Sequence, residues 1–530
     1  MRGALKFRVA VGLFVSLITV TASVTYGFAN EDRSFLIVDS FGEGVSGSSE
    51  IYAMPEDQVQ AIINNKESNY LPTRKFCETL TSGPCAEPTG LSLRIYLPVC
   101  DATIVNYCIE SLGISSGGDQ QVQQIQQGQL LGYSGGRIYA ADPAKGVPQA
   151  SAPSLWKVPN INNKAGTDTY TAKLLLDGFL SVKSNKLYVF AVSAIVEPYV
   201  NKPLSNNSSD CNSWQSSTAC GQRTDFVPGQ QAQLTVRLPN TVTGWLHGRF
   251  KGATIAVDKF DANQNRLTVT AENVVVPELS TTLTEAQFQS LPNPAFFTTN
   301  GSTWRSVNAG NPAALEWVKQ FATVLKDTAT GEHTTWSFST IPPVSGGNQC
   351  FQDKTRLIGL VMTNALVYSP GAPDFDGKQL NYQVGGFHFK PDGTTLTTGT
   401  YDLLMRSDSA RCLYNFTDAP ISASVSVTTA SGQDQQIATT VLSEKGGWLH
   451  LSATGFTFST PMLRVKLTGT PKVLSTQNNS GNSNQNMNQS PGNSNKSNSN
   501  KRYVLTCVKG KVVKKMTVPE PKCPVGWKKK

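Results

Sequence analysis

The chain of 530 residues is poor in charge, in histidine and in long apolar runs. Asp, Glu, Lys and Arg together make up 16% of it, while Gly, Ser, Thr, Asn and Gln are plentiful, a balance typical of exported β-rich proteins. None of the four histidines lies within ten residues of a cysteine, which argues against zinc sites. After residue 29 no stretch is long and apolar enough for a membrane-spanning helix.

One apolar run lies at the N-terminus and indicates export. Arg2, Lys6 and Arg8 precede the uncharged segment 9–24, and Gly27 and Ala29 are small residues at the −3 and −1 positions of a signal-peptidase site. We therefore expect residues 1–29 to be a cleaved signal peptide and the mature protein to be secreted. An uncleaved membrane anchor is the alternative. No cysteine follows the run, so a lipoprotein is not expected.

The ten cysteines agree with an oxidising compartment. Their spacing predicts five disulfides: Cys77 with Cys85, Cys100 with Cys108, Cys211 with Cys220, Cys350 with Cys412, and Cys507 with Cys523. Within the first four cysteines three connectivities are possible, and the local pairs are preferred because short loops close first. We expect no bound metal and no cofactor.

Alternating apolar residues predict a mainly β fold. Leu234, Val236 and Leu238 share one strand face, as do Leu267, Val269 and Ala271, and Leu463 with Val465. Asp376-Gly377 and Asp392-Gly393 supply turns. A chain of 57 kDa is too long for one small domain. We expect a disulfide-rich N-terminal region (34–150) and two sandwich-like β-rich domains (151–280 and 340–472).

Helical patterns are few and cluster between these domains. Pro55 opens one short candidate, which runs to Asn65. Asn311 is a suitable cap for a helix to about Lys326, and a shorter helix is expected from Thr284. Residues 281–339 should thus form a helical connector. The apolar stripe of the longer helix predicts core packing.

The tetrapeptide GWLH occurs twice, at residues 244–247 and 447–450. The two copies could be an internal repeat or a coincidence. In a strand, Trp245 shares a face with His247, and Trp448 with His450. An exposed tryptophan face could bind a sugar ring, so these four residues are candidate ligand contacts. The competing interpretation, a buried tryptophan in a sandwich core, is favoured.

The C-terminal part has a different composition from the rest. Asn and Ser dominate residues 475–500, which predicts a disordered linker. Residues 501–530 contain ten Lys or Arg and one Glu, a net charge of +9, while the preceding 500 residues carry 36 charges of each sign. We expect this segment to be a small two-stranded hairpin that turns at Lys509-Gly510 and is held by the Cys507–Cys523 bridge.

The C-terminal segment resembles a group of uncharacterised exported proteins of actinobacteria. The matching residues are CVKGK (507–511), VVKK (512–515) and PKCPVGWKKK (521–530), which resemble a recurrent C-terminal signature that usually has Tyr in place of Trp527. In the body, YLPVCDA (96–102), SPGAPDFDGKQLNY (369–382) and ARCLYNF (410–416) are weaker likenesses. The resemblance implies a location in the cell envelope and no catalytic residues.

Three kinds of short motif resemble cofactor, catalytic or calcium sites, but each lacks neighbouring residues or structure that such a site needs. Gly42, Gly44 and Gly47 form GxGxxG without a following helix. Ser115 lies in GxSxG, and His247 or His450 would be the partner to test for a hydrolase. The possible calcium ligands Asp374, Asp376 and Gly377, and likewise Asp261, Asn263 and Asn265, lack the later bidentate glutamate. We expect a flexible loop at GxGxxG, no hydrolase site in the β-rich, disulfide-bound surroundings of Ser115, and turns at the two acidic segments.

Together these features predict an envelope-associated protein with a binding or structural role rather than an enzyme. The candidate surface-binding residues are Lys509, Lys511, Lys514, Lys515, Lys522, Lys528, Lys529 and Lys530. Because the protein is expected outside the cell, cell-wall polyanions or a membrane surface are the expected partners, and nucleic acid is not. The alternatives are a soluble charged tail without a partner and an exported hydrolase acting on polysaccharide or ester substrates.

Overall fold

The structure is a computed structural model in which a defined set of residues can be described. These are residues 32–38, 48–64, 74–86, 90–117, 124–204, 211–297, 304–341, 348–353, 355–417, 422–428, 434–436, 439–458, 462–470, 503–509, 512–518 and 528–529. The predicted signal peptide 1–29, the GxGxxG segment and the predicted linker 475–500 lie outside this set. The chain divides into two compact units, Met1–Lys472 and Val473–Lys530.

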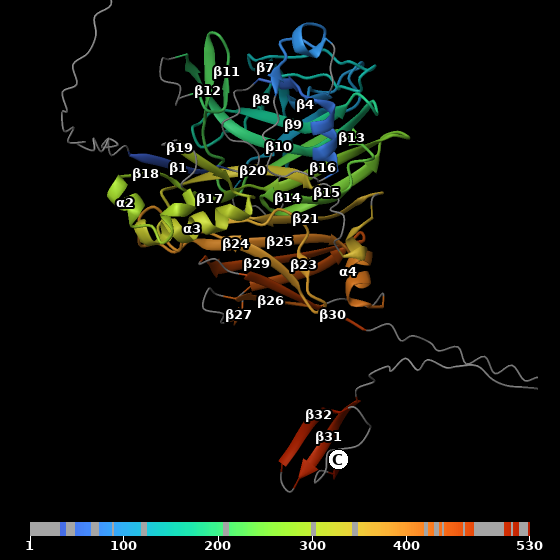
Figure 1. The fold of residues 1–530 in the computed structure, drawn as a ribbon, viewed down its shortest axis with the longest axis vertical. Helices are drawn as coiled ribbons and strands as arrows, with labels where there is room; N and C mark the ends of the chain where they lie inside the picture. Colours follow the sequence, from blue (N-terminus) through green and yellow to red (C-terminus); the bar gives the residue numbers. More distant parts are fainter. Residues whose placement is uncertain are drawn as a thin grey trace, which may run out of the picture. The chain divides into compact units, whose positions relative to one another are not determined.

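The described part of the first unit is mainly β, as the sequence predicts, and it is organised around one large sheet (Figure 1). Along its main path this sheet contains β28 (Thr439–Lys445), β29 (Trp448–Thr457), β25 (Thr398–Arg406), β21 (Leu357–Thr363), β14 (Gly244–Arg249), β20 (Gly331–Ile341), β10 (Lys186–Pro203), β9 (Thr169–Ser181), β4 (Gly90–Tyr96), β2 (Glu50–Ala53) and β3 (Lys75–Phe76). Off this path lie β17 (Val274–Glu278), β12 (Ala219–Arg223), β11 (Trp214–Gln215), β8 (Ser154–Lys157) and β7 (Gln129–Tyr133). Strands β14 and β21 run parallel, whereas the other described neighbours on the path are antiparallel.

Two further sheets pack against the large one. The first contains β15 (Lys251–Lys259), β16 (Gln264–Glu272), β13 (Gln231–Pro239), β5 (Cys108–Ser115) and β6 (Ile125–Gln127). The second contains β22 (Val367–Tyr368), β24 (Leu380–Gly385), β30 (Met462–Thr468), β26 (Ser422–Thr428), β27 (Asp434–Gln436) and β23 (Asp374–Phe375). The apolar faces predicted for β13, β16 and β30 are buried.

The two sandwiches share the middle of the large sheet and use its opposite faces. On β14, Leu246 belongs to the first core, while its neighbour Trp245 belongs to the second. Adjacent residues of β25 divide in the same way, with Leu404 in the first core and Leu403 in the second. Since successive side chains of a strand point to opposite faces, the sheet lies between the two cores. Strands from residues 34–150 and 151–280 also contribute to the same sheets, through the pairs β4–β9 and β5–β13.

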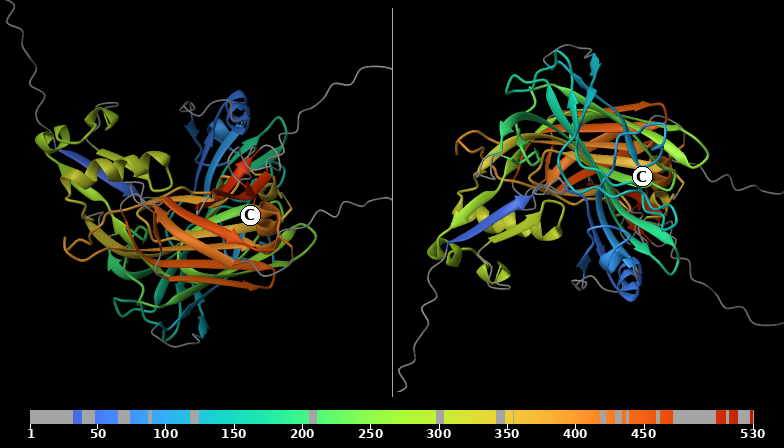
Figure 2. Two further views of the ribbon diagram at one scale, coloured as in Figure 1. Left: turned by 90° about the horizontal axis from the view of Figure 1, so that it is seen from below. Right: turned by 90° about the horizontal axis from the view of Figure 1, so that it is seen from above.

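A third core lies under the helices at one end of the first unit (Figure 2). It is formed by the three-stranded sheet β18 (Ser280–Leu283), β1 (Arg33–Val38) and β19 (Trp304–Asn308), by α2 (Glu285–Gln289) and α3 (Pro312–Val324), and by the 3-10 turn η3 (Pro294–Phe297). Phe35 of β1 contacts the rings of Phe288, Phe297, Trp317 and Phe321. The first described strand of the chain is therefore central to this core.

Three of the four described α-helices begin where the sequence predicts, and α4 (Ser407–Tyr414) was not expected. Asn311 caps α3, and its Oδ1 accepts a hydrogen bond from Ala313 N at 2.9 Å. Thr284 and Gln287 form a reciprocal capping box at α2. The other described α-helices are α1 (Glu56–Ile63), which follows Pro55, and α4 (Ser407–Tyr414). In the described part of the chain, none of these helices combines the length and apolarity needed to cross a bilayer.

Four of the five predicted disulfides are present, including the preferred local pairs. They join Cys77 to Cys85, Cys100 to Cys108, Cys211 to Cys220, and Cys350 to Cys412. The last one links η4 (Gln349–Phe351) to α4. Cys523 lies outside the described residues, so its pairing with Cys507 remains a prediction.

The described part of the second unit is a small antiparallel sheet. Strands β31 (Tyr503–Lys509) and β32 (Val512–Val518) pair along their full length, and β33 (Lys528–Lys529) joins the other edge of β31. The predicted hairpin is thus present. Its backbone register sets Cys507 opposite both Lys514 on β32 and Lys529 on β33.

Candidate functional site

The four residues of the two GWLH segments lie in different surroundings. All six residues of β14 are buried, and Trp245 and His247 are 4% and 5% exposed. The Trp245 ring packs edge-on against Phe351, with centroids 5.0 Å apart. Both side chains are therefore core residues, the interpretation that the sequence favours, and neither offers an open face on which a sugar could stack.

The second copy is more accessible but also packed. On β29 the buried positions alternate, so that Trp448 and His450 are half-buried while Leu449 is buried. The guanidinium of Arg406 lies over the Trp448 ring, 4.9 Å from its centroid. His450 Nε2 is buried and has no hydrogen-bond partner among the described residues. The two copies thus differ in burial, although both strands belong to the large sheet.

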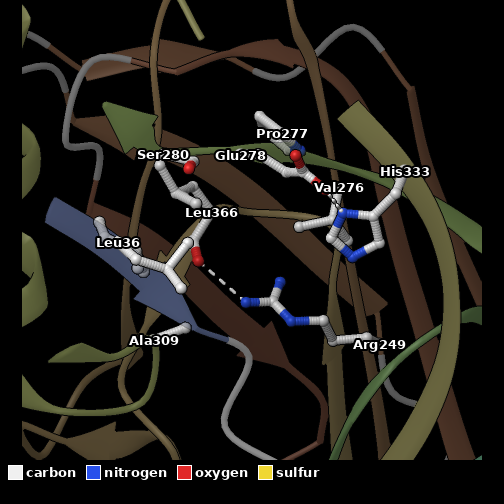
Figure 3. A pocket seen from close by; sticks show the side chains of 10 residues that line it. Leu36, Arg249, Val276, Pro277, Glu278, Ser280, Ala309, His333 and Leu366 are labelled. Carbon is white, nitrogen blue, oxygen red and sulfur yellow. Dashed lines mark hydrogen bonds and ion pairs between the residues drawn. The ribbon is translucent and has the colours of Figure 1, made fainter. Parts of the chain in front are cut away.

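A pocket lies where the three-stranded sheet meets β17, β20 and β14 (Figure 3). It has a volume of about 160 Å³. The residues that line it are Leu36, Ile37, Arg249, Val276, Pro277, Glu278, Ser280, Ala309, His333 and Leu366. Most are apolar, and the charged or titratable ones are Arg249, Glu278 and His333. We take this pocket as the candidate functional site.

Strand pairing brings Glu278 and His333 together. The antiparallel register of β17 and β20 sets Glu278 opposite Gly331, so His333, two residues further along, is its diagonal neighbour on the same face. The carboxylate oxygen Oε1 of Glu278 is hydrogen-bonded to Nδ1 of His333 (Figure 3). Gly331 makes room for this carboxylate, because a Cβ atom there would lie 2.7 Å from Glu278 Oε2.

Arg249 reaches the pocket from the end of β14. The residue is 1% exposed, and its guanidinium donates to the main-chain oxygens of Ala365 and Leu366, the latter at 2.9 Å. It also lies over the Tyr368 ring, 4.8 Å from the centroid. The Tyr368 hydroxyl lies 2.7 Å from Nδ1 of His247. A buried network therefore connects Arg249 through Tyr368 to His247.

The charged and titratable residues of this pocket belong to none of the motifs recognised in the sequence. The sequence contains one indication of Arg249. It lies two positions after His247, so the two residues share a face of the same strand, and a charged residue in such a position is unusual. Glu278 and His333 are 55 residues apart, and only the β17–β20 register brings them together. No sequence spacing indicates that contact.

The motifs weighed for catalysis or calcium are explained by local structure. Ser115 is fully buried in β5, and its hydroxyl accepts a hydrogen bond from Gln231 N at 2.8 Å, as suits a strand residue rather than an exposed nucleophile. Asp376 and Asp261 accept main-chain hydrogen bonds within their own turns. The pocket contains one carboxylate, Glu278, whereas most glycosidases need two.

Comparison with models of known families, with curated proteins and with solved structures finds no match to this chain.

Proposed function

We propose that the chain is an exported, envelope-associated protein whose body has a binding or structural role and whose cationic C-terminal module holds it at an anionic surface. The observation that carries the proposal is the distribution of charge. Residues 501–530 have a net charge of +9, and the other 500 residues have none. A compact positive charge on a neutral protein favours association with polyanions.

Two features outside the C-terminal module support the location. The four disulfides of the body are compatible with an oxidising compartment, since such bonds persist outside the cytosol and are rare within it. The N-terminal sequence has the pattern of a secretory signal peptide. Both features fit the resemblance of the C-terminal segment to exported proteins.

The attraction between the C-terminal module and an anionic surface should be the sum of small contributions from many lysines. A single lysine near an anionic surface contributes about 1 kcal/mol, so several lysines are needed for lasting retention. The β31–β32–β33 sheet concentrates Lys509, Lys514, Lys515, Lys528 and Lys529 in one small unit. Because the attraction acts between exposed charges, it is screened over about 8 Å at physiological salt. Retention by charge should therefore weaken as salt is raised.

The test is fractionation of cells that express the full chain and matched variants. Deletion of residues 501–530 should release the body into the medium, and moderate salt should release the full chain. Changing Lys528, Lys529 and Lys530 to Gln should weaken retention in part. A matched control changes the exposed body residues Lys183, Lys202 and Lys259 to Gln, which removes the same charge and should leave retention unchanged.

Other outcomes discriminate between mechanisms. Retention that resists salt but is lost in Cys507→Ser would indicate recognition of the folded hairpin by a sorting factor. Retention of the deleted chain at the full-length level would refute the role of the module. Binding of the purified protein to anionic lipid vesicles, compared with binding to wall preparations from which anionic polymers have been extracted, identifies the surface.

A further inference from the structure

We propose that a row of aromatic side chains on the outer face of the large sheet binds a single chain of a neutral polysaccharide. This aromatic row consists of Phe76, Tyr52, Phe179 and Tyr188. The proposal gives a ligand class to the binding role proposed for the body, and it rests on that proposed function for the location outside the cell. Its test uses the purified protein, so a failure of retention at the envelope and a failure of glycan binding are separate results.

Strand register places the four rings in one line across the sheet. Tyr188 of β10 is the partner of Phe179 on β9, and Phe179 is the partner of Ser92 on β4 (Figure 1). Ser92 is in turn the partner of Tyr52 on β2, which pairs with Phe76 on β3. Neighbouring strands lie about 4.8 Å apart, so the line from β10 to β3 is about 19 Å long. The aromatic row therefore offers successive contacts to an extended chain.

The aromatic row lies on the face of the sheet that is turned away from the first core. On β9, Leu180 belongs to the first core, and on β4 both Leu91 and Leu93 belong to it. Since successive side chains of a strand point to opposite faces, Phe179 and Ser92 lie on the other face. All four rings of the row are partly exposed. The row is thus a strip of accessible aromatic surface, of the kind on which a sugar ring can stack.

Cations of exposed residues show that ring faces of the row are turned toward solvent. The guanidinium of Arg74 lies over the Tyr52 ring, 5.1 Å from its centroid, and Lys186 Nζ lies 5.2 Å from the centroid of Tyr188. Both cations belong to exposed residues. A cation–π contact at an exposed site contributes only about 0.5–1 kcal/mol. A sugar ring can therefore displace these side chains at a small cost.

A second row of side chains, two residues further along the strands, supplies hydrogen-bonding groups. Glu50 of β2 is the partner of Arg94 on β4, and Arg94 is the partner of Asp177 on β9. Arg94 Nε lies 3.9 Å from Asp177 Oδ1, and the two side chains are 41% and 30% exposed. Because charges of both signs alternate, this row favours neither a polyanion nor a polycation. Hydroxyl groups donate to carboxylates and accept from a guanidinium, so a neutral polyhydroxylated chain is the complementary ligand.

Ring orientation and the neighbouring helix define the shape of the ligand. Tyr52 and Phe76 pack edge to face, with an angle of 73° between their planes. A flat crystalline surface cannot stack on both rings at once, whereas a single chain can turn between them. On the side away from the charged residues, α1 packs against the sheet at Gly90, where a Cβ atom would lie 2.6 Å from Cγ2 of Val59. The ligand is therefore limited to the strip between α1 and the charged residues.

The experiment uses the purified full chain and neutral oligosaccharides as probes. The probes are the hexasaccharides of β-1,4-linked, β-1,3-linked and α-1,4-linked glucose. Saturation-transfer NMR should detect binding of at least one of them, and that hexasaccharide should raise Tm as expected for a ligand of the folded state. The disaccharide of the same linkage cannot span the row and should bind at least about tenfold more weakly. Absence of transfer from all three hexasaccharides, or equal affinity for disaccharide and hexasaccharide, would overturn the proposal.

Variants of the row locate the binding surface. Phe179→Thr removes a central ring but keeps a residue that favours strands, and it should weaken hexasaccharide binding by at least about fivefold. Phe179→Tyr keeps the ring and should bind like the wild type, which separates loss of the contact from loss of the fold. The control Phe260→Thr removes an exposed ring outside the row and should also bind normally. Undiminished binding by folded Phe179→Thr and Tyr188→Thr proteins would place the glycan elsewhere and refute the assignment.

Discussion

Nδ1 of His247 lies 2.7 Å from the hydroxyl of Tyr368, and both side chains are buried between the large sheet and β22. Burial, with a smaller contribution from the nearby charge of Arg249, lowers the pKa of His247 to about 3. The imidazole is therefore neutral at physiological pH. This pairing ties a residue of the GWLH segment to the residue that supports Arg249.

The first prediction is that His247 makes the folded state sensitive to acid. The ordinary pKa of histidine is 6.5, so between that value and about pH 3 the unfolded chain binds a proton that the folded chain does not. The stability from this group is complete above about pH 6.5 and is lost as the pH falls, by about 1.4 kcal/mol per pH unit. Urea unfolding of the wild type and of His247→Gln, at pH 7 and pH 5, measures this difference.

The control for this prediction is Tyr368→Phe. It removes the hydrogen bond but keeps His247 buried, so the protein should be less stable at both pH values and retain the pH dependence. An identical pH dependence of stability in His247→Gln and the wild type would contradict the prediction.

The second prediction concerns the contact of Trp245 with Gly359 on the parallel strand β21. These residues are partners in the register, and a Cβ atom on Gly359 would lie 2.3 Å from Cζ3 of Trp245. Because the ring is rigid and packed against Phe351, Gly359→Ala should destabilise the protein by about 1–3 kcal/mol. Denaturant midpoints measure this cost.

A double variant isolates the steric cause. Replacing Trp245 by Leu in the Gly359→Ala background removes the clash, so the two substitutions should together cost less than the sum of each alone. Strict additivity would show that Gly359 is needed for another reason.

The third prediction ranks two disulfides by their contribution to the stability of the folded protein. The Cys350–Cys412 bridge closes a loop of 62 residues and the Cys100–Cys108 bridge a loop of 8. A disulfide restricts the unfolded chain more when the loop it closes is longer. The longer loop should therefore contribute about 4 kcal/mol to the free energy of unfolding, and the shorter about 2.5 kcal/mol. Paired Cys→Ala substitutions at each bridge, compared by urea unfolding, should give this order. The reverse order would show that local packing outweighs chain entropy.

The fourth prediction concerns the C-terminal module. The composition of residues 475–500 predicts a linker, and the chain divides into units at residue 472. A protease of broad specificity should therefore cut first in 475–500 and release an intact basic fragment. Alkylation of that fragment without reductant should label neither Cys507 nor Cys523. Early cleavage within the body, or two labelled cysteines, would count against the linker and the bridge respectively.

Local features of this protein follow from its sequence. The period of two in β13, β16 and β30, the capping residues Asn311 and Thr284, and the spacing of the local cysteine pairs all act between near neighbours, and each appears as expected. The charge of the C-terminal segment is likewise a property of composition.

The shared sheet and the pocket were decided by the tertiary structure, because both depend on which strands become neighbours. Alternation identifies two faces of β14 but not that Leu246 and Trp245 enter different cores, so the sequence could not show that the two sandwiches share a sheet. It favoured an interior position for Trp245 but did not show which residues pack against it. The pocket depends on pairings over long separations, such as that of Glu278 with His333. Such contacts arise when burial of apolar surface selects one strand order among many, and no local residue pattern specifies that order.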